Sequence, residues 1–119
     1  MKKIVLLLVL LLPLLSCQKV DEVIVKYVIS DNASGFLVNY INEEGVMVSD
    51  AVINNSAQDT WSYAFTTDRG QIIFISAISK DINDGIKVSL IIDGKTFKQG
   101  SSNNDTTNYV TVSGTVPYN

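Results

Sequence analysis

Alternation of apolar and polar residues at every second position is the feature that most constrains the fold of this chain. It is clearest where Trp61, Tyr63 and Phe65 alternate with small or polar residues. Successive side chains of a β-strand point to opposite faces of a sheet, so this pattern predicts a strand buried on one face. No stretch of 11 or more residues after residue 16 shows a clean apolar period of 3.6 residues, so helices are not expected there.

Similar short runs recur along the chain, separated by turn-rich segments. We expect strands at 23–30, 36–41, 46–52, 61–66, 71–79, 86–92, 95–99 and 109–116. Short strands with turns at intervals of roughly 8–12 residues are typical of a sandwich or barrel. About seven or eight such strands in one domain of about 100 residues favour an all-β, immunoglobulin-like antiparallel β-sandwich.

Two of these runs carry more specific signals. Asp93-Gly94 lies directly between two strand-like runs, which predicts a hairpin with a type I′ turn. Within 71–79, the run Ile72-Ile73-Phe74-Ile75 is apolar on both faces, so we expect a central strand that is covered or paired on most sides. Residues 100–108 are polar, and we expect a loop there.

Bulky apolar residues at inward positions define the expected core. The inward aromatics are expected to include Phe36, Tyr40 and Phe97, and the structural core is expected to be formed by Trp61, Tyr63, Phe65, Phe74, Val88 and Leu90. An alternative is that Trp61 and Tyr63 line a face that binds sugar or lipid, because aromatic rings stack on flat ligands. The core interpretation is favoured, and Tyr109 and Tyr118 are the better candidates for exposed aromatics.

The N-terminus has the layout of a secretory signal: Lys2 and Lys3, an apolar run from Ile4 to Leu12, and then Leu14-Leu15-Ser16-Cys17. This last stretch resembles the lipobox of bacterial lipoproteins. The resemblance implies a lipoprotein signal peptide at 1–16, cleavage between Ser16 and Cys17, and acylation of Cys17. An apolar run this short does not span a bilayer, which needs ~20 residues. The alternative is an ordinary signal peptide followed by an incidental cysteine.

The lipid anchor would set the location of the protein. Residues 17–22 are expected to be the lipidated cysteine and a short tether, and 23–119 the β-sandwich domain. The expected partner is membrane lipid through the acylated Cys17, because two or three acyl chains anchor a protein stably. We expect the cell envelope, in the outer membrane of a diderm bacterium, with the domain facing the periplasm or the cell surface.

Composition argues against several classes of function. Removal of Lys2 and Lys3 with the signal leaves 7 basic residues against 12 acidic ones, a formal charge of −5, so no nucleic acid is expected as partner. The chain has no histidine, which removes the usual general base and the commonest metal ligand. Most acidic residues fall in expected turns, where they commonly bond to their own backbone. We therefore expect no enzyme activity and no cofactor.

The acidic segment 81–85 resembles part of a calcium-binding loop. Gly85 would stand at position 6 of an EF-hand loop, but position 1 would then be Lys80. The frame therefore fails, and no metal site is expected.

Three short motifs resemble the MmpS family, the small accessory proteins of mycobacterial membrane transport. They are Tyr27-Val28 with Val38-Asn39-Tyr40, then Thr60-Trp61-Ser62, and then Ser89-Leu90-Ile91-Ile92-Asp93-Gly94-Lys95. The resemblance implies an immunoglobulin-like sandwich outside the membrane that assists proton-driven exporters of the RND type. Thr60 stands where the family typically has proline, and lipid would replace its transmembrane helix.

The sequence thus leaves two hypotheses about function. The first is a non-catalytic, lipid-anchored envelope protein that acts as an interaction or accessory module, with an RND-type transporter or another envelope protein as its partner. The alternative is a lipid-anchored β-sandwich that binds a small ligand or a glycan.

Substitution of Cys17 tests the anchor. We expect Cys17→Ala to move the protein out of the membrane fraction while the domain keeps its fold, because the acyl chains would be lost and the core untouched. Detergent-phase partitioning and circular dichroism measure the two effects. Unchanged partitioning of the variant would contradict lipid attachment.

Overall fold

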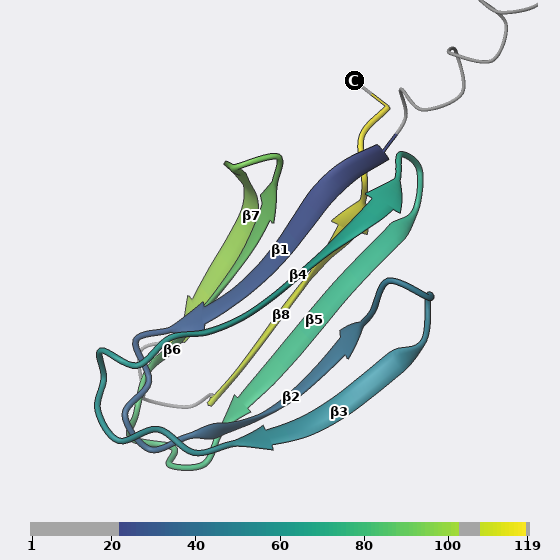
Figure 1. Ribbon diagram of the computed structural model, residues 1–119. Helices are drawn as coiled ribbons and strands as arrows, with labels where there is room; N and C mark the ends of the chain where they lie inside the picture. Colours follow the sequence, from purple (N-terminus) through teal and green to yellow (C-terminus); the bar gives the residue numbers. More distant parts are fainter. Residues whose placement is uncertain (1–21, 103–107, 119) are drawn as a thin grey trace, which may run out of the picture.

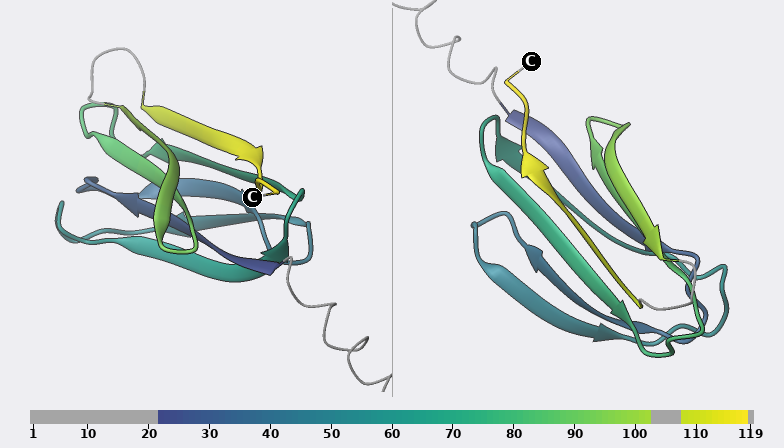
Figure 2. Two further views of the ribbon diagram at one scale, coloured as in Figure 1. Left: turned by 90° about the horizontal axis from the view of Figure 1, so that it is seen from above. Right: turned by 180° about the vertical axis from the view of Figure 1, so that it is seen from behind.

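The computed structural model describes residues 22–102 and 108–118, which fall in strands and their connections. Eight strands in this part of the chain form two antiparallel sheets that face each other (Figures 1 and 2). The strands are β1 (Glu22–Ser30), β2 (Phe36–Ile41), β3 (Met47–Val52), β4 (Trp61–Asp68), β5 (Ile72–Ser79), β6 (Ile86–Ile92), β7 (Lys95–Ser102) and β8 (Tyr109–Thr115). The prediction of an all-β sandwich of seven or eight strands is confirmed.

The sheets are built mainly by connections that cross between them. Sheet A has the strand order β4-β1-β6-β7, and sheet B has the order β3-β2-β5-β8. Only the β2–β3 and β6–β7 hairpins of the described strands stay within one sheet. Successive strands run in opposite directions, so the connections lie alternately at the two ends of the sandwich, which we call poles. The N-terminal pole is where β1 begins, and the last described residues lie beside it (Figure 1). The loop pole is the opposite end.

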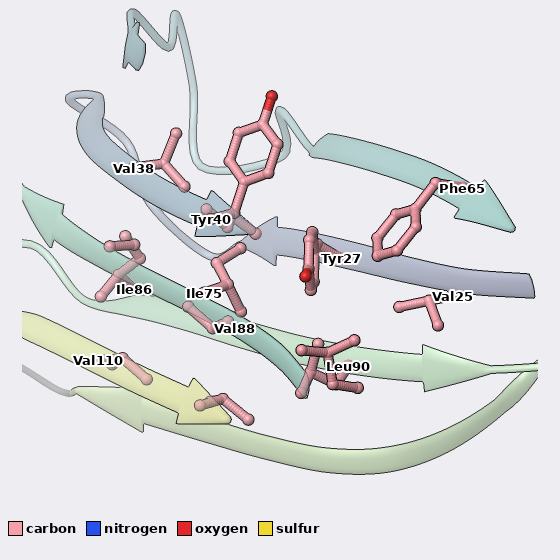
Figure 3. Close-up of a cluster of buried hydrophobic side chains, with 14 of the residues drawn as sticks. Val25, Tyr27, Val38, Tyr40, Phe65, Ile75, Ile86, Val88, Leu90 and Val110 are labelled. Carbon is pink, nitrogen blue, oxygen red and sulfur yellow. The ribbon is translucent and has the colours of Figure 1, made fainter. Parts of the chain in front are cut away.

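Inward side chains of both sheets form one core (Figure 3). Val88 and Leu90 are fully buried, and Phe65 is nearly so, at the inward positions expected for them. Trp61 and Tyr63 are partly buried and pack against this core, as does Phe97.

Phe74 corrects one expectation about the core. On β5 the buried residues are Ile73, Ile75 and Ala77, so Phe74 points to the outer face of sheet B. Its neighbour on β8 is Ser113. The run 72–75 is apolar at every position, so alternation could not show which half faces inward. The strand is central in its hydrogen bonding, between β2 and β8, but only one of its faces is covered.

The β6–β7 hairpin confirms the expected turn and corrects the length of its second strand. Asp93 and Gly94 have φ angles of 50° and 83°, and a type I′ turn requires positive φ at both central residues. Pairing is shifted between Leu90 and Ile91 by a β-bulge. Strand β7 then continues to Ser102, so the expected loop at 100–108 begins later than predicted, and 103–107 lie outside the described residues.

Tyr27 joins the two sheets through its hydroxyl. The side chain is fully buried, and it reaches from β1 across the core to the place where the ladder between β2 and β5 ends. There the hydroxyl donates to Ile41 O at 2.7 Å and accepts from Phe74 N at 3.4 Å. Burial raises the pKa of Tyr27 to about 12, and the bond from Phe74 N partly offsets this.

Asn32 ties the connections together at the loop pole. Its amide nitrogen donates to Ser79 Oγ at 2.8 Å and Gly85 O at 3.0 Å. Its amide oxygen accepts from Gly35 N at 2.7 Å and Asn54 Nδ2 at 3.1 Å. All four hydrogen-bonding positions of this buried amide are therefore used. Together with Asn108 Nδ2, which donates to Ser79 O, these bonds link the β1–β2, β3–β4, β5–β6 and β7–β8 connections.

Gly35 is required in this arrangement for steric reasons. Its φ is +113°, and a Cβ added there would lie 2.5 Å from Val52 O. Only glycine lets the chain pass this close to the end of β3.

Tyr27→Phe tests the bridge between the sheets. We expect the free energy of unfolding to fall by about 2 kcal/mol at neutral pH, because two partly buried backbone groups lose their partner. Urea denaturation followed by tryptophan fluorescence measures this. A loss within error of zero would show that the hydrogen bonds of the hydroxyl make no net contribution to the free energy of unfolding.

The same residue predicts a loss of stability at alkaline pH. The pKa is about 12 in the folded protein against 10 for an ordinary tyrosine, so the unfolded chain loses the proton first. This contribution to stability is complete below pH 10 and is lost as pH rises through 12. The difference in unfolding free energy between wild type and Tyr27→Phe should therefore shrink over this range. A constant difference would contradict the prediction.

Asn32→Ala should destabilise the domain by about 3 kcal/mol, because several buried polar groups at the loop pole lose their partner at once. Asn42→Ala is the matched control. Asn42 Oδ1 also accepts from two backbone amides, those of Glu44 and Val46, but in an exposed turn. Water can replace those bonds, so we expect a loss below about 1 kcal/mol. Equal losses in urea denaturation would contradict the special role of Asn32.

Candidate functional site

The outer face of sheet B is the main candidate surface, because it is uncharged throughout. Cross-strand register places the following residues on it: Leu37, Asn39 and Ile41 of β2; Met47, Ser49 and Ala51 of β3; Ile72, Phe74, Ser76 and Ile78 of β5; Tyr109, Thr111, Ser113 and Thr115 of β8. None of them carries a charge, although the chain is acidic overall.

Exposed apolar side chains form a continuous row across this face. Leu37, Ile78 and Tyr109 are direct neighbours on β2, β5 and β8. Their exposed fractions are 48%, 39% and 56%. Ala51 extends the row onto β3. A row of this kind is not explained by packing within the domain, because each side chain points away from the core.

A polar row separates the first apolar row from a second one. Asn39 accepts a hydrogen bond from Ser49 Oγ, and Thr111 Oγ1 donates to Ser76 Oγ at 3.1 Å. Beyond this row lie Met47, Ile41 and Phe74, and then Ile72, which is largely exposed. The face therefore alternates apolar and uncharged polar bands.

The surface is shallow rather than deeply concave. A hollow of about 340 Å³ lies between β2 and β3. It is lined by Leu37, Asn39, Ser49, Ala51 and Ile78 of the outer face, and also by Val38 and Asp50, which register places on the inner side. Its lining contains no aromatic residue. Such a surface suits an apolar contact with another protein better than it suits enclosure of a small molecule.

The opposite face of the sandwich differs in charge. Outward positions of sheet A include Glu22, Lys26, Asp68 and Lys87, which register places on the side away from the core. Charged side chains are strongly hydrated and are depleted from the centres of protein interfaces. The contrast between the two faces singles out sheet B.

Further hollows lie at the N-terminal pole, and two of them are lined by charged residues. One, of about 290 Å³, is lined by the acidic residues Glu22, Glu43, Glu44 and Asp68. Among the described residues, no group of three or more Cys, Asp or Glu is placed to hold a metal ion. The other, of about 310 Å³, is lined by residues that include Arg69, Lys95 and Phe97, and it has one aromatic residue.

Trp61 and Tyr63 belong to a cluster of aromatic rings on the inner side of the sheets. Tyr40 lies at the centre, with ring centroids 5.4 Å from Trp61 and 4.9 Å from Tyr63. Phe36 and Phe65 extend the cluster. Burial raises the pKa of Tyr40, and the nearby Tyr63 and Asp50 raise it further. These rings contact one another and are partly or fully buried, which favours a structural role for Trp61 and Tyr63 over a platform for a flat ligand.

The structure does not describe the two residues of the expected cleavage and lipidation site. Ser16 and Cys17 lie outside the described residues. Tyr109 and Tyr118 are exposed, as expected. No helix in the described part of the chain is long and apolar enough to cross a membrane.

No protein-family model matches the chain, and no curated protein matches it either. The likeness to the MmpS family therefore remains a prediction that depends on the short motifs quoted above.

Sequence reasoning missed the outer face of sheet B, although a signal for it was present. Apolar residues stand at positions where an alternating strand would carry polar ones, namely Leu37, Ile41, Ile72 and Ile78. Apolar residues at both phases of a strand indicate that both faces are covered, in this chain or by a partner.

Proposed function

We propose that this protein is a non-catalytic, lipid-anchored envelope protein that binds a partner protein through the outer face of sheet B. The observation that carries the proposal is the uncharged face with its row Leu37, Ile78 and Tyr109, which contrasts with the charged face of sheet A. Exposed apolar patches on soluble domains commonly mark sites of interaction.

The position of the tether supports an anchored module. Strand β1 begins at Glu22, which is paired with Asp68. Glu22 follows Cys17 by five positions, so the two residues are at most about 17 Å apart when the chain between them is fully extended. Acylation of Cys17 would therefore hold the N-terminal pole near the membrane, with sheet B free to face a neighbouring envelope protein. The outer membrane of a diderm bacterium is the location we propose.

The partner we propose has an apolar, uncharged surface of its own, since a charged surface would lose hydration without gaining a counter-charge. An RND-type exporter is the partner class that the resemblance to the MmpS family suggests. Binding of a small ligand or a glycan is the weaker alternative, because the shallow hollow on sheet B contains no aromatic residue.

Photo-crosslinking in cells tests this proposal. A crosslinking amino acid at Leu37 or Ile78 should capture a specific envelope protein, and one at Ile24 is the control. Ile24 is also exposed but lies on the outer face of sheet A. The double variant Leu37→Lys/Ile78→Lys should lower recovery of the captured protein about tenfold, while Ile24→Lys should not. Thermal unfolding should be nearly unchanged in both.

The identity of the captured protein separates the possibilities. An RND-type exporter would support the accessory role. Another envelope protein would support an interaction module and contradict the transporter role. Equal capture from Leu37 and Ile24, or recovery of bulk lipoproteins alone, would contradict the proposal as a whole.

A further inference from the structure

The outermost strands of the two sheets are not equally protected against pairing with another chain. Proteins commonly protect free strand edges with inward-pointing charges, bulges, or lysines. On β3, Asp50 lies opposite the buried Val38 and so points to the core side of its sheet. On β7, a bulge interrupts the register and Lys95 and Lys98 are exposed. These features block continuous pairing at both strands.

The edge of β8 is covered by its neighbour in the other sheet. Lys98 Nζ donates to Ser113 O at 3.0 Å, and β7 and β8 contact each other along one side of the sandwich. An added strand at β8 would have to displace this lysine. Three of the four edges formed by the described strands are therefore protected.

Strand β4 is the exception. It pairs with β1 over its whole length without a shift in register, and it is the outermost strand of sheet A. It contains no lysine, arginine or proline, and its single charge is Asp68 at its end. Its outward residues Ser62, Ala64 and Thr66 are small. The free edge is therefore long and regular, and its backbone amides and carbonyls are available for a ladder.

The sequence of β4 and the residue before it is nearly symmetric about Tyr63. In an antiparallel pair of two copies centred on Tyr63, Trp61 of one copy lies opposite Phe65 of the other. Ser62 then lies opposite Ala64, and Thr60 opposite Thr66. Aromatic pairs and threonine pairs across strands are favourable, and no two like charges meet in this register. Trp61 and Tyr63, which are only partly buried in one copy, would each gain an aromatic neighbour.

We propose that two copies of this chain associate through β4, forming one continuous antiparallel sheet with a two-fold axis at Tyr63. The interface is isologous, as in most symmetric dimers. The axis is perpendicular to sheet A, so Glu22 of the two copies lies at opposite ends of the joined sheet. Two anchored copies would then lie with sheet A along the membrane. This orientation depends on the proposed anchor, whereas the pairing itself does not.

Disulfide crosslinking between two tagged full-length chains tests the register. One chain carries Ser62→Cys and the other carries Ala64→Cys. The proposed pairing places their Cα atoms about 5 Å apart, within the range that a disulfide spans. We expect a crosslinked heterodimer after mild oxidation in cells. Its yield should be ~tenfold above that of the crosslinked homodimer of either variant alone. In those homodimers the two cysteines lie diagonal to each other, for example residue 62 of one copy and residue 62 of the other, and so are farther apart.

Two controls make the result specific. The pair Ser62→Cys and Thr66→Cys is out of register and should give little product. The chain without an added cysteine reports any reaction of Cys17. Product from all pairs equally, or from none, would overturn the proposal.

The association state of the purified full-length chain in detergent provides a second measurement. Light scattering should show a dimer for the wild type and a monomer for Ser62→Glu/Ala64→Glu, because the carboxylate introduced at position 62 of one copy would face the one at position 64 of the other. Within one copy, the carboxylate at position 64 would lie opposite Lys26, so the fold should be kept. Ser49→Glu/Ala51→Glu on β3 is the matched control and should remain dimeric. A monomeric wild type, or a dimeric Ser62→Glu/Ala64→Glu variant, would overturn the proposal.

Discussion

The hydroxyl of Tyr27 makes hydrogen bonds that join the two sheets through the core. The described residues contain no cysteine, so no disulfide in this part of the chain links the sheets. Tyr27 bonds to β2 and β5 at the point where their own ladder ends. Its ring also lies against Tyr40 and Phe65, which belong to different sheets. One side chain thus supplies both apolar contact and a directional bond across the core.

The buried amide of Asn32 has a comparable role at the loop pole, where connections rather than strands meet. Loops normally satisfy their backbone groups with water. Here the connections are drawn together, so a fully bonded side chain must replace that water. Asn32 thus joins the connections at one end of the sandwich, and Tyr27 joins the two sheets in its middle.

These constraints leave two surfaces with different properties. The outer face of sheet B is apolar and uncharged, and it suits a partner that packs against side chains. The free edge of β4 offers backbone groups, and it suits a strand. The two lie on different sheets, so binding at one does not occupy the other. A dimer joined through sheet A would present two copies of the sheet B face, which would strengthen binding to a repeated or symmetric partner.

The sequence by itself determined the strands, the type I′ turn and most of the inward face, because alternation and turn chemistry are local properties. It could not assign Phe74, since a run that is apolar at every position has no preferred face. It could not reveal the role of Asn32 either, because the buried amide network joins residues 22, 47 and 53 positions apart. The order of strands, the uncharged face and the unprotected edge were decided only by the tertiary structure, since each depends on which strands become neighbours.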